Sequence, residues 1–212
     1  MKHISFHFDV ISPFAYLAFE QLPQALEGLS YSVDYRPVLF AGLLTHWGQK
    51  GPAEIEPKRA WTFRHVHWLA QQHGVELQVP AQHPFNPLAL LRLATACAPA
   101  GQTPSRHVCE RVFCHVWRGG ADANDPQRLA QLAAELAPVR DPQGDEVKLA
   151  LKDATAAAIA KSVFGVPTFE VDGKLFWGLD ALPMLAACLR GDAWFSGPAW
   201  DEAAVARPGV RR

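Results

Sequence analysis

Ser12 and Pro13 occupy a position in the chain where a side chain could do chemistry. They follow an apolar run and precede a second run that contains Ala15 and Tyr16. Serine is a preferred N-cap and proline a preferred first helical residue, so the pair predicts the start of a helix. A hydroxyl there can donate to an anion, and the helix dipole favours negative charge. If that anion is a bound thiolate, both effects lower the pKa of the thiol and activate its sulfur.

Other chemistry at this position is excluded or has no support. The run Ser12-Pro13-Phe14-Ala15 contains no cysteine, so dithiol–disulfide exchange cannot occur here. The four cysteines at 97, 109, 114 and 188 form no Cys-x-x-Cys pair and are interpreted as mostly buried small apolar groups. The pattern places no histidine–aspartate relay beside the serine. The plain alternative is that Ser12 only caps a helix.

A second informative stretch lies near the end of the chain, at Val166-Pro167. Asp172-Gly173 is a two-residue turn signal, which predicts a hairpin with strands 168–171 and 174–177. Gly178 then breaks the chain, and Asp180 is expected to cap a helix that ends near Gly191. The start of that helix suits a carboxylate ligand. The alternative is an ordinary hairpin packed under a helix.

The remaining elements frame these two stretches. Alternation predicts a strand over 4–11, then a helix to about residue 28 and a strand at about 31–39, in the order of a parallel βαβ unit. Between about 40 and 155 only helical signals remain. Several of those helices open at a residue pair ending in proline: Glu56-Pro57, Asn86-Pro87, Thr103-Pro104, Asp125-Pro126 and Asp141-Pro142. A last helix is predicted at about 153–163, and the chain from Ser196 on is predicted to be irregular.

Together these elements predict an α/β fold. An apolar residue before a proline that opens a hairpin, followed by a helix, resembles the second half of a thioredoxin-like domain, in which that proline is cis. The predicted architecture is therefore a thioredoxin-like domain formed by residues 1–40 plus 160–212. A large all-helical insertion, residues 41–159, interrupts it.

Composition excludes several classes of function. The 212 residues are 49% hydrophobic and 19% charged, with a formal net charge of −1, which gives no footprint for nucleic acid or an anionic membrane. The first residues lack the apolar core of a signal peptide and no run is long enough to span a bilayer, so a cytoplasmic enzyme is expected. No metal site is expected, because His65 and His67 do not share a helix face and His107, Cys109, Cys114 and His115 spread around an axis.

In five sequence motifs the chain resembles the 2-hydroxychromene-2-carboxylate isomerase family. That family belongs to the thioredoxin-like group that also holds kappa-class glutathione transferases and the disulfide oxidoreductase A (DsbA) proteins. The resemblance rests on five motifs that span nearly the whole chain. They are Phe8-Asp9-Val10-Ile11-Ser12-Pro13-Phe14-Ala15-Tyr16-Leu17-Ala18, Tyr35-Arg36-Pro37-Val38-Leu39, Pro84-Phe85-Asn86, Phe164-Gly165-Val166-Pro167-Thr168-Phe169 and Phe176-Trp177-Gly178-Leu179-Asp180.

The resemblance implies glutathione as cofactor. Ser12 would hold its thiolate, and the Val166 backbone beside Pro167 would pair with its cysteinyl part as an added strand. Leu179 and Asp180 would bind the γ-glutamyl end, with Trp177 and Gly178 beside them. The implied reaction is the isomerisation of a small aromatic compound by reversible addition of the thiolate, carried out by a homodimer. Two alternatives stay open: a kappa-type transferase of hydrophobic electrophiles, and a non-catalytic thioredoxin-like binding module.

The resemblance also implies a substrate pocket after the second strand. Its expected lining is Phe40, Leu44, Trp47, Gln49 and Phe85, whose mainly apolar character suits an aromatic compound, although core packing explains any one of these residues equally well. Two departures from the family pattern affect the binding residues. Ala181 stands where many relatives have an arginine, and Gln49 lies in a segment where relatives often show Gly-Asn.

Overall fold

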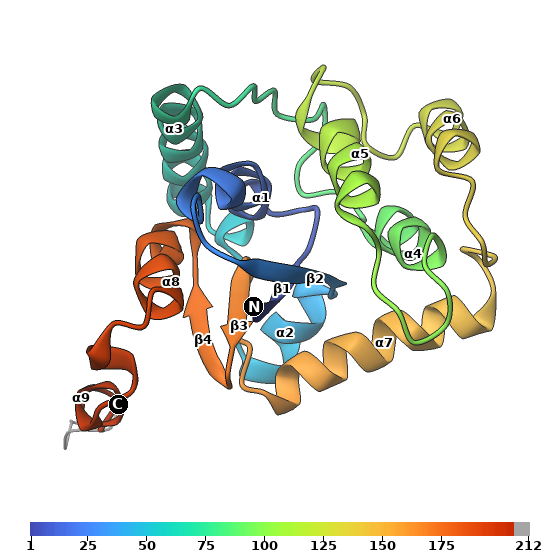
Figure 1. The fold of residues 1–212 in the computed structure, drawn as a ribbon. Helices are drawn as coiled ribbons and strands as arrows, with labels where there is room; N and C mark the ends of the chain where they lie inside the picture. Colours follow the sequence, from blue (N-terminus) through green and yellow to red (C-terminus); the bar gives the residue numbers. More distant parts are fainter. Residues whose placement is uncertain (206–212) are drawn as a thin grey trace.

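A four-stranded mixed sheet forms the centre of the molecule, in a computed structural model that describes residues 1–205 (Figure 1). The strand order is β2-β1-β3-β4, with β1 (Lys2–Phe8), β2 (Tyr31–Pro37), β3 (Thr168–Val171) and β4 (Lys174–Trp177). β1 runs parallel to β2 and antiparallel to β3. The predicted βαβ unit is therefore present, and the hairpin has the predicted bounds.

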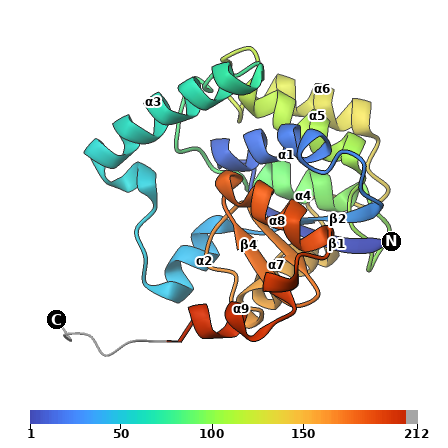
Figure 2. The same ribbon diagram turned by 60° about the vertical axis from the view of Figure 1, so that its left-hand side comes forward.

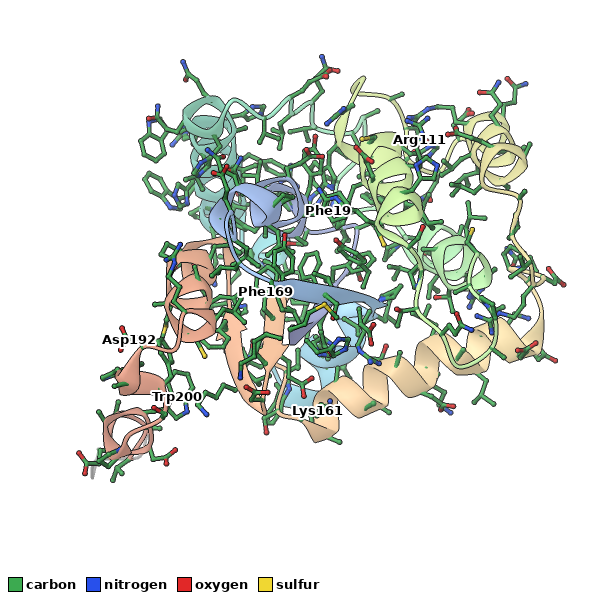
Figure 3. All side chains as sticks on the ribbon, in the orientation of Figure 1. Phe19, Arg111, Lys161, Phe169, Asp192 and Trp200 are labelled. Atoms are coloured by element: carbon green, nitrogen blue, oxygen red, sulfur yellow. The ribbon has the colours of Figure 1, made fainter. Side chains whose placement is uncertain are left out.

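The alternation in β1 determines how the sheet packs. Ile4, Phe6 and Phe8 are fully buried, and Phe6 stacks on Phe169 of β3 with ring centroids 4.7 Å apart. Phe169 lies in the interior with Phe19 of the first helix (Figure 3). The strand ends at Phe8, three residues earlier than predicted, because the Asp9 carboxylate accepts a hydrogen bond from the Ile11 N–H and turns the chain.

Helices cover both faces of the sheet. α1 (Pro13–Ala25) and α8 (Leu182–Leu189) lie on one face, and α2 (Phe40–Trp47) and α7 (Asp145–Ala160) lie on the other (Figures 1 and 2). α3 (Glu56–His73) packs beside α1. Within residues 1–205, no helix combines the length and the apolar character needed to cross a membrane.

The helices between β2 and β3 also include α4 (Leu88–Ala96), α5 (Arg106–Trp117) and α6 (Pro126–Leu136), with a 3-10 turn at Pro52–Glu54. α5 joins this helical block to the sheet domain, because its Phe113 and Trp117 are fully buried against Tyr16 of α1. The predicted fold class, a thioredoxin-like sheet with many helices between its two halves, is confirmed.

Three further details of the prediction were wrong. Residues 145–160 form one continuous helix rather than two, because the alanine-rich run after Leu149 has high helix propensity and contains no breaker. Asp180 does not cap α8: it lies inside a 3-10 turn, Leu179–Ala181, and α8 begins at Leu182. The segment from Ser196 on is not all irregular, because it contains the short helix α9 (Pro198–Ala203), whose Trp200 packs on Phe176; residues 206–212 lie outside the part that the structure describes. A 3-10 turn, Ala193–Phe195, precedes this segment.

Candidate active site

Ser12 and Val166, which are 154 positions apart in sequence, meet at one point of the fold. Ser12 is the N-cap of α1, as predicted, and its Oγ accepts a hydrogen bond from the Ala15 N–H at 3.2 Å. The same hydroxyl donates to the Val166 carbonyl at 3.4 Å. The Val166–Pro167 peptide bond is cis. The serine at the helix start and the backbone before the hairpin proline therefore lie side by side.

Two side chains from elsewhere in the chain, and one from the loop itself, hold the loop that carries Ser12. The Trp117 indole N–H donates to the Val10 carbonyl at 2.9 Å, and the His83 Nε2 donates to the Ile11 carbonyl at 2.9 Å. Burial lowers the pKa of His83, which favours the neutral ring with its proton on that nitrogen. The third is Asp9, at the beginning of the loop. All three side chains form hydrogen bonds with backbone groups of the loop, and these bonds hold its conformation.

The Asp9 carboxylate links this loop to the start of α2. It is completely buried and accepts from the Ile11 N–H at 3.0 Å and from the Phe40 N–H at 2.9 Å. Burial raises the pKa of Asp9 to about 7, against the two backbone hydrogen bonds, which lower it. The only local sign of this role in the sequence is an acidic residue at the end of an apolar strand.

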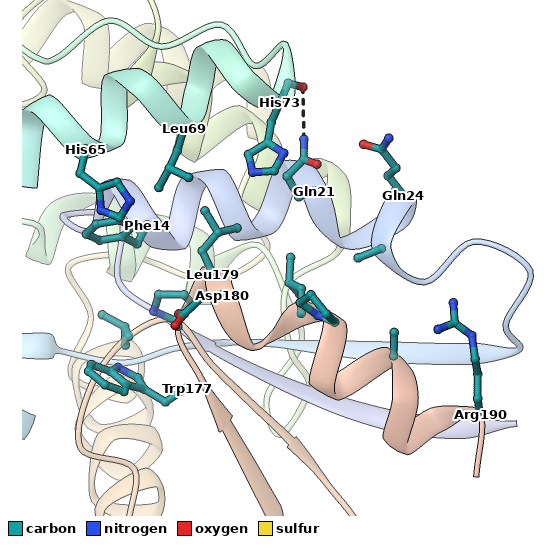
Figure 4. Close-up of a pocket in the computed structure, with 17 residues that line it drawn as sticks. Phe14, Gln21, Gln24, His65, Leu69, His73, Trp177, Leu179, Asp180 and Arg190 are labelled. Carbon is teal, nitrogen blue, oxygen red and sulfur yellow. Dashed lines mark hydrogen bonds between the residues drawn. The ribbon is translucent and has the colours of Figure 1, made fainter. Parts of the chain in front are cut away.

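A groove of about 830 Å³ passes between α1, α3 and α8 beside Val166 (Figure 4). Its volume is within the range of small-molecule sites. Six residues that the sequence assigned to cofactor binding line it: Val166, Pro167, Trp177, Gly178, Leu179 and Asp180. Ser12 itself does not line the groove: it is buried behind Val166, to whose carbonyl its hydroxyl donates.

The five residues expected to form the substrate pocket do not line this groove. Phe40 packs in a small cluster with Val38, Leu43 and Ala158, and Phe85 is buried in the main core. Leu44 is half-buried, while Trp47 and Gln49 are exposed at the end of α2 and just beyond it. The segment after β2 folds on the α7 face of the sheet, which takes these side chains away from the groove.

Other side chains form the far walls of the groove and were not predicted as site residues. Phe14 and Gln21 come from α1, and His65, Leu69 and His73 come from α3. The three α3 residues are spaced by four, so they share one helix face. That spacing is visible in the sequence and predicts a shared helix face. It does not predict a site, because only the fold places this face of α3 opposite α8.

Metal-ligating groups and cysteines of this chain were sought among the described residues at this site. Among residues 1–205, no three His, Cys, Asp or Glu side chains form a group that could hold a metal ion. All four cysteines are free, and none lines the groove. Burial raises the pKa of each of the four thiols, most strongly at Cys109.

Comparison with known proteins identifies the family of this chain. The model of the DsbA-like thioredoxin domain matches residues 3–190. This chain belongs to that family. A thiol oxidoreductase of this fold needs a cysteine where this chain has Ser12, usually with a second where it has Ala15. This member of the family has neither cysteine, which sets it apart from such enzymes.

Two groups of enzymes are similar to this family member over most of its length. A 2-hydroxychromene-2-carboxylate isomerase of Sphingobium xenophagum is 30% identical, covering 89% of this chain and 98% of the relative. The glutathione S-transferase kappa 1 of Rattus norvegicus is 28% identical, covering 90% and 91%. A solved structure of a 2-hydroxychromene-2-carboxylate isomerase superposes with a TM-score of 0.78 at 23% identity, covering 92% and 97%. The resemblance inferred from the motifs is confirmed, and the chain is related to enzymes.

Proposed function

We propose that this protein is a glutathione-dependent isomerase of 2-hydroxychromene-2-carboxylate-like aromatic compounds, in which Ser12 stabilises the glutathione thiolate. The observation that carries the proposal is the contact between the Ser12 hydroxyl and the Val166 carbonyl at the wall of the groove. It brings an anion-stabilising donor next to backbone that can receive a peptide. Relatives named as isomerases and as glutathione transferases support the same class of chemistry.

The backbone of Val166 fits an extended tripeptide. Within residues 1–205, its N–H has no hydrogen-bond acceptor, and its carbonyl receives only the long bond from Ser12. A peptide strand laid against Val166 would use both groups, which is how extended peptides add to a sheet edge. Asp180, exposed on the groove wall, would accept from the α-amino group of the γ-glutamyl residue.

Ser12 is suited to hold an anion. One lone pair of its Oγ is committed to the Ala15 N–H, which fixes the oxygen in position. Its hydroxyl hydrogen bonds Val166 at 3.4 Å, a long contact for an O–H donor, so this hydrogen can turn towards a sulfur at low cost. The N-terminus of the 13-residue α1 adds favourable potential for negative charge.

Bound glutathione would supply a sulfur nucleophile that can add to a conjugated carbon and leave it again. The residues of this chain would lower the pKa of the thiol and align the peptide. An isomerase releases the sulfur after bond rotation, so glutathione is not consumed. A kappa-type transferase would keep the adduct as product, and the two outcomes differ in whether free thiol disappears.

Calorimetry with glutathione tests the proposal, followed by turnover of 2-hydroxychromene-2-carboxylate with the free thiol counted before and after. The proposal predicts binding, catalysis that requires glutathione, and an unchanged thiol count. Loss of one thiol per product would instead establish the transferase reaction. Absence of any binding heat would refute glutathione dependence and favour the binding module.

A pair of aspartate variants makes the binding test specific. Asp180→Asn removes the proposed acceptor for the γ-glutamyl amine and should weaken glutathione binding by about tenfold, since one charge-assisted hydrogen bond is lost. Asp192→Asn is the matched control, because Asp192 caps a 3-10 turn outside the groove. Equal affinities in the two variants would contradict the proposed orientation of glutathione.

A further inference from the structure

Aromatic rings border the end of the groove nearest Val166. Phe14 and His65 enter from α1 and α3, and Trp177 enters from the opposite side, from the end of β4 (Figure 4). The rest of the groove is different in character. Its other end is lined by Gln21, Gln24 and Arg190. A ligand in the groove therefore meets flat apolar surfaces at one end only.

On α3, three rings form a row, of which only His65 lines the groove. His65 stacks on Trp61, with centroids 6.1 Å apart and planes at 26°, and on Trp68, at 6.4 Å and 23°. The ring of Phe14 meets His65 edge-on at 5.8 Å. The three α3 residues are spaced i, i+4 and i+7, so one helix face carries the whole row. The imidazole of His65 therefore lies between two exposed indoles and beside Phe14 at the wall of the groove.

Trp177, on the opposite wall, packs against neighbouring residues. Trp177 is 55% exposed, yet it packs on Phe164 with centroids 5.0 Å apart. Its indole lies over Gly165, where any Cβ would approach the indole nitrogen to 2.6 Å. The glycine immediately before Val166 therefore makes room for this ring. A large indole held in place with one side open offers a surface for stacking.

Polar groups that can recognise an acidic ligand also line the groove. Asp180 is the only carboxylate among the described lining residues, and His65, His73 and Arg190 carry nitrogen hydrogen-bond donors. Asp180 is already assigned to the amine of glutathione in the proposed function. Of the three donors, only His65 belongs to the aromatic end. It can donate a hydrogen bond to an acidic substituent of a ring stacked beside it.

We propose that Phe14, His65 and Trp177, which we call the aromatic slot, form the subsite of the second substrate, so that Trp177 contacts this substrate rather than glutathione. This inference rests on the proposed function, which puts the reactive sulfur between Ser12 and Val166, next to the slot. The slot takes a flat ring by stacking, and His65 selects rings that carry an acidic group such as a carboxylate or phenolate. His65 is thus a specificity-determining residue. The slot replaces the segment 40–49 as the site of substrate selection.

Three small probes separate stacking from recognition of the acid. We would measure binding of 2-naphthoate, 2-naphthalenemethanol and cyclohexanecarboxylate by calorimetry, with the protein saturated with glutathione. The slot predicts that 2-naphthoate binds most tightly, because only this probe combines a flat ring with an acid. Equal affinity for naphthoate and cyclohexanecarboxylate would overturn the stacking role of the slot.

Variants then test the individual walls. Trp177→Leu should weaken both naphthalene probes by about tenfold, since the stacking surface is lost. His65→Leu should weaken naphthoate by about tenfold and naphthalenemethanol by no more than about threefold. Trp194→Leu is the control, because this exposed indole lies outside the groove. If a leucine variant does not fold, Trp177→Phe and His65→Gln replace it.

The outcomes distinguish this inference from the proposed function. Unchanged naphthoate affinity in the His65 and Trp177 variants, with weakening in Trp47→Leu, would overturn the slot while leaving glutathione dependence intact. If the wild-type protein does not bind glutathione, the same probes are measured without it. Naphthoate binding that still depends on His65 and Trp177 would then support the slot even though the proposed function fails.

Discussion

The loop 9–12 and the segment 40–49 begin at similar places in the fold but differ in burial and in their position relative to the groove. Each follows one of two neighbouring parallel strands, so both start at the same edge of the sheet. The loop is fixed behind the wall of the groove, and its Ser12 is buried beside Val166. The segment turns to the other face, and its Trp47 is 41% exposed. Strand order alone therefore does not decide which loop forms the site.

The difference lies in the partners of the backbone. The carbonyls of Val10 and Ile11 accept hydrogen bonds from Trp117 and His83, which belong to the helical block far along the chain. The segment 40–49 makes a contact of the same chemical kind, from the Trp47 indole to the Val163 carbonyl at 3.0 Å, but at a partly exposed position. Buried polar contacts hold the first region rigid, and such rigidity is what a catalytic group requires.

The largest effect is expected from Ser12→Ala. Turnover should fall by about 100-fold, because the donor to the bound thiolate is lost. Ser105→Ala is the matched control: Ser105 caps α5 by accepting from the Val108 N–H at 3.3 Å and lies away from the groove. Each change should cost about 1 kcal/mol of folding free energy through the lost cap. Similar turnover in the two variants would reduce Ser12 to a helix cap.

The two indole contacts should differ in their contribution to stability. Trp117→Phe leaves the Val10 carbonyl without its partner in the core and should lower the free energy of unfolding by about 2–3 kcal/mol. Trp47→Phe, at the exposed position, should lower it by less than about 1 kcal/mol. Urea denaturation of the two variants provides the comparison. Equal losses would mean that the loop 9–12 is held no more firmly than the segment 40–49.

Asp9 joins the two regions and should give stability a dependence on pH. Burial raises the pKa of this carboxyl from its ordinary value of 3.8 to about 7. The folded state therefore holds the proton more tightly, and the stabilisation is complete below about pH 4. It is lost as the pH rises to about 7, with a slope of about 1.4 kcal/mol per pH unit.

Asp9→Asn cannot ionise, so its stability should not show this decline between pH 4 and 7. Asp125→Asn, which alters the cap of α6 outside the groove, should retain the wild-type decline. Denaturant titrations across this pH range would measure both. A wild-type decline that persists unchanged in Asp9→Asn would show that another group causes it.

The smallest effect is expected at Gln49. This side chain is exposed just beyond α2 and does not line the groove, so Gln49→Ala should change kcat and KM by less than about twofold. Steady-state kinetics with the isomerase substrate provide the measurement. A large rise in KM would favour the segment 40–49 as the substrate site, as the sequence first indicated, over the aromatic slot.

Local signals in the sequence were sufficient for the hairpin and for the cap at Ser12. Asp172 and Gly173 both adopt positive φ, as their turn requires, and Ser12 accepts from Ala15 as an N-cap does. The pairing of Ser12 with Val166 was expected only through the family resemblance. It depends on how two halves of a sheet meet, which no local pattern specifies.

The rest of the site depends on contacts that are distant in sequence. Nothing near Trp117 or His83 indicates that they hold the backbone before Ser12. The spacing of His65, Leu69 and His73 does predict one helix face, but the helix opposite it is more than 100 residues further along the chain. The expected pocket after β2 failed to coincide with the groove because the direction of α2 is set by packing on α7.

The most direct test of the central claim is the pKa of the glutathione thiol when bound. Ultraviolet absorbance of the thiolate, followed against pH, should show a pKa well below that of free glutathione in the wild-type protein and in Ser105→Ala. In Ser12→Ala the pKa should return most of the way to the free value while glutathione still binds. A bound thiol whose pKa is the same in wild type and Ser12→Ala would contradict the account.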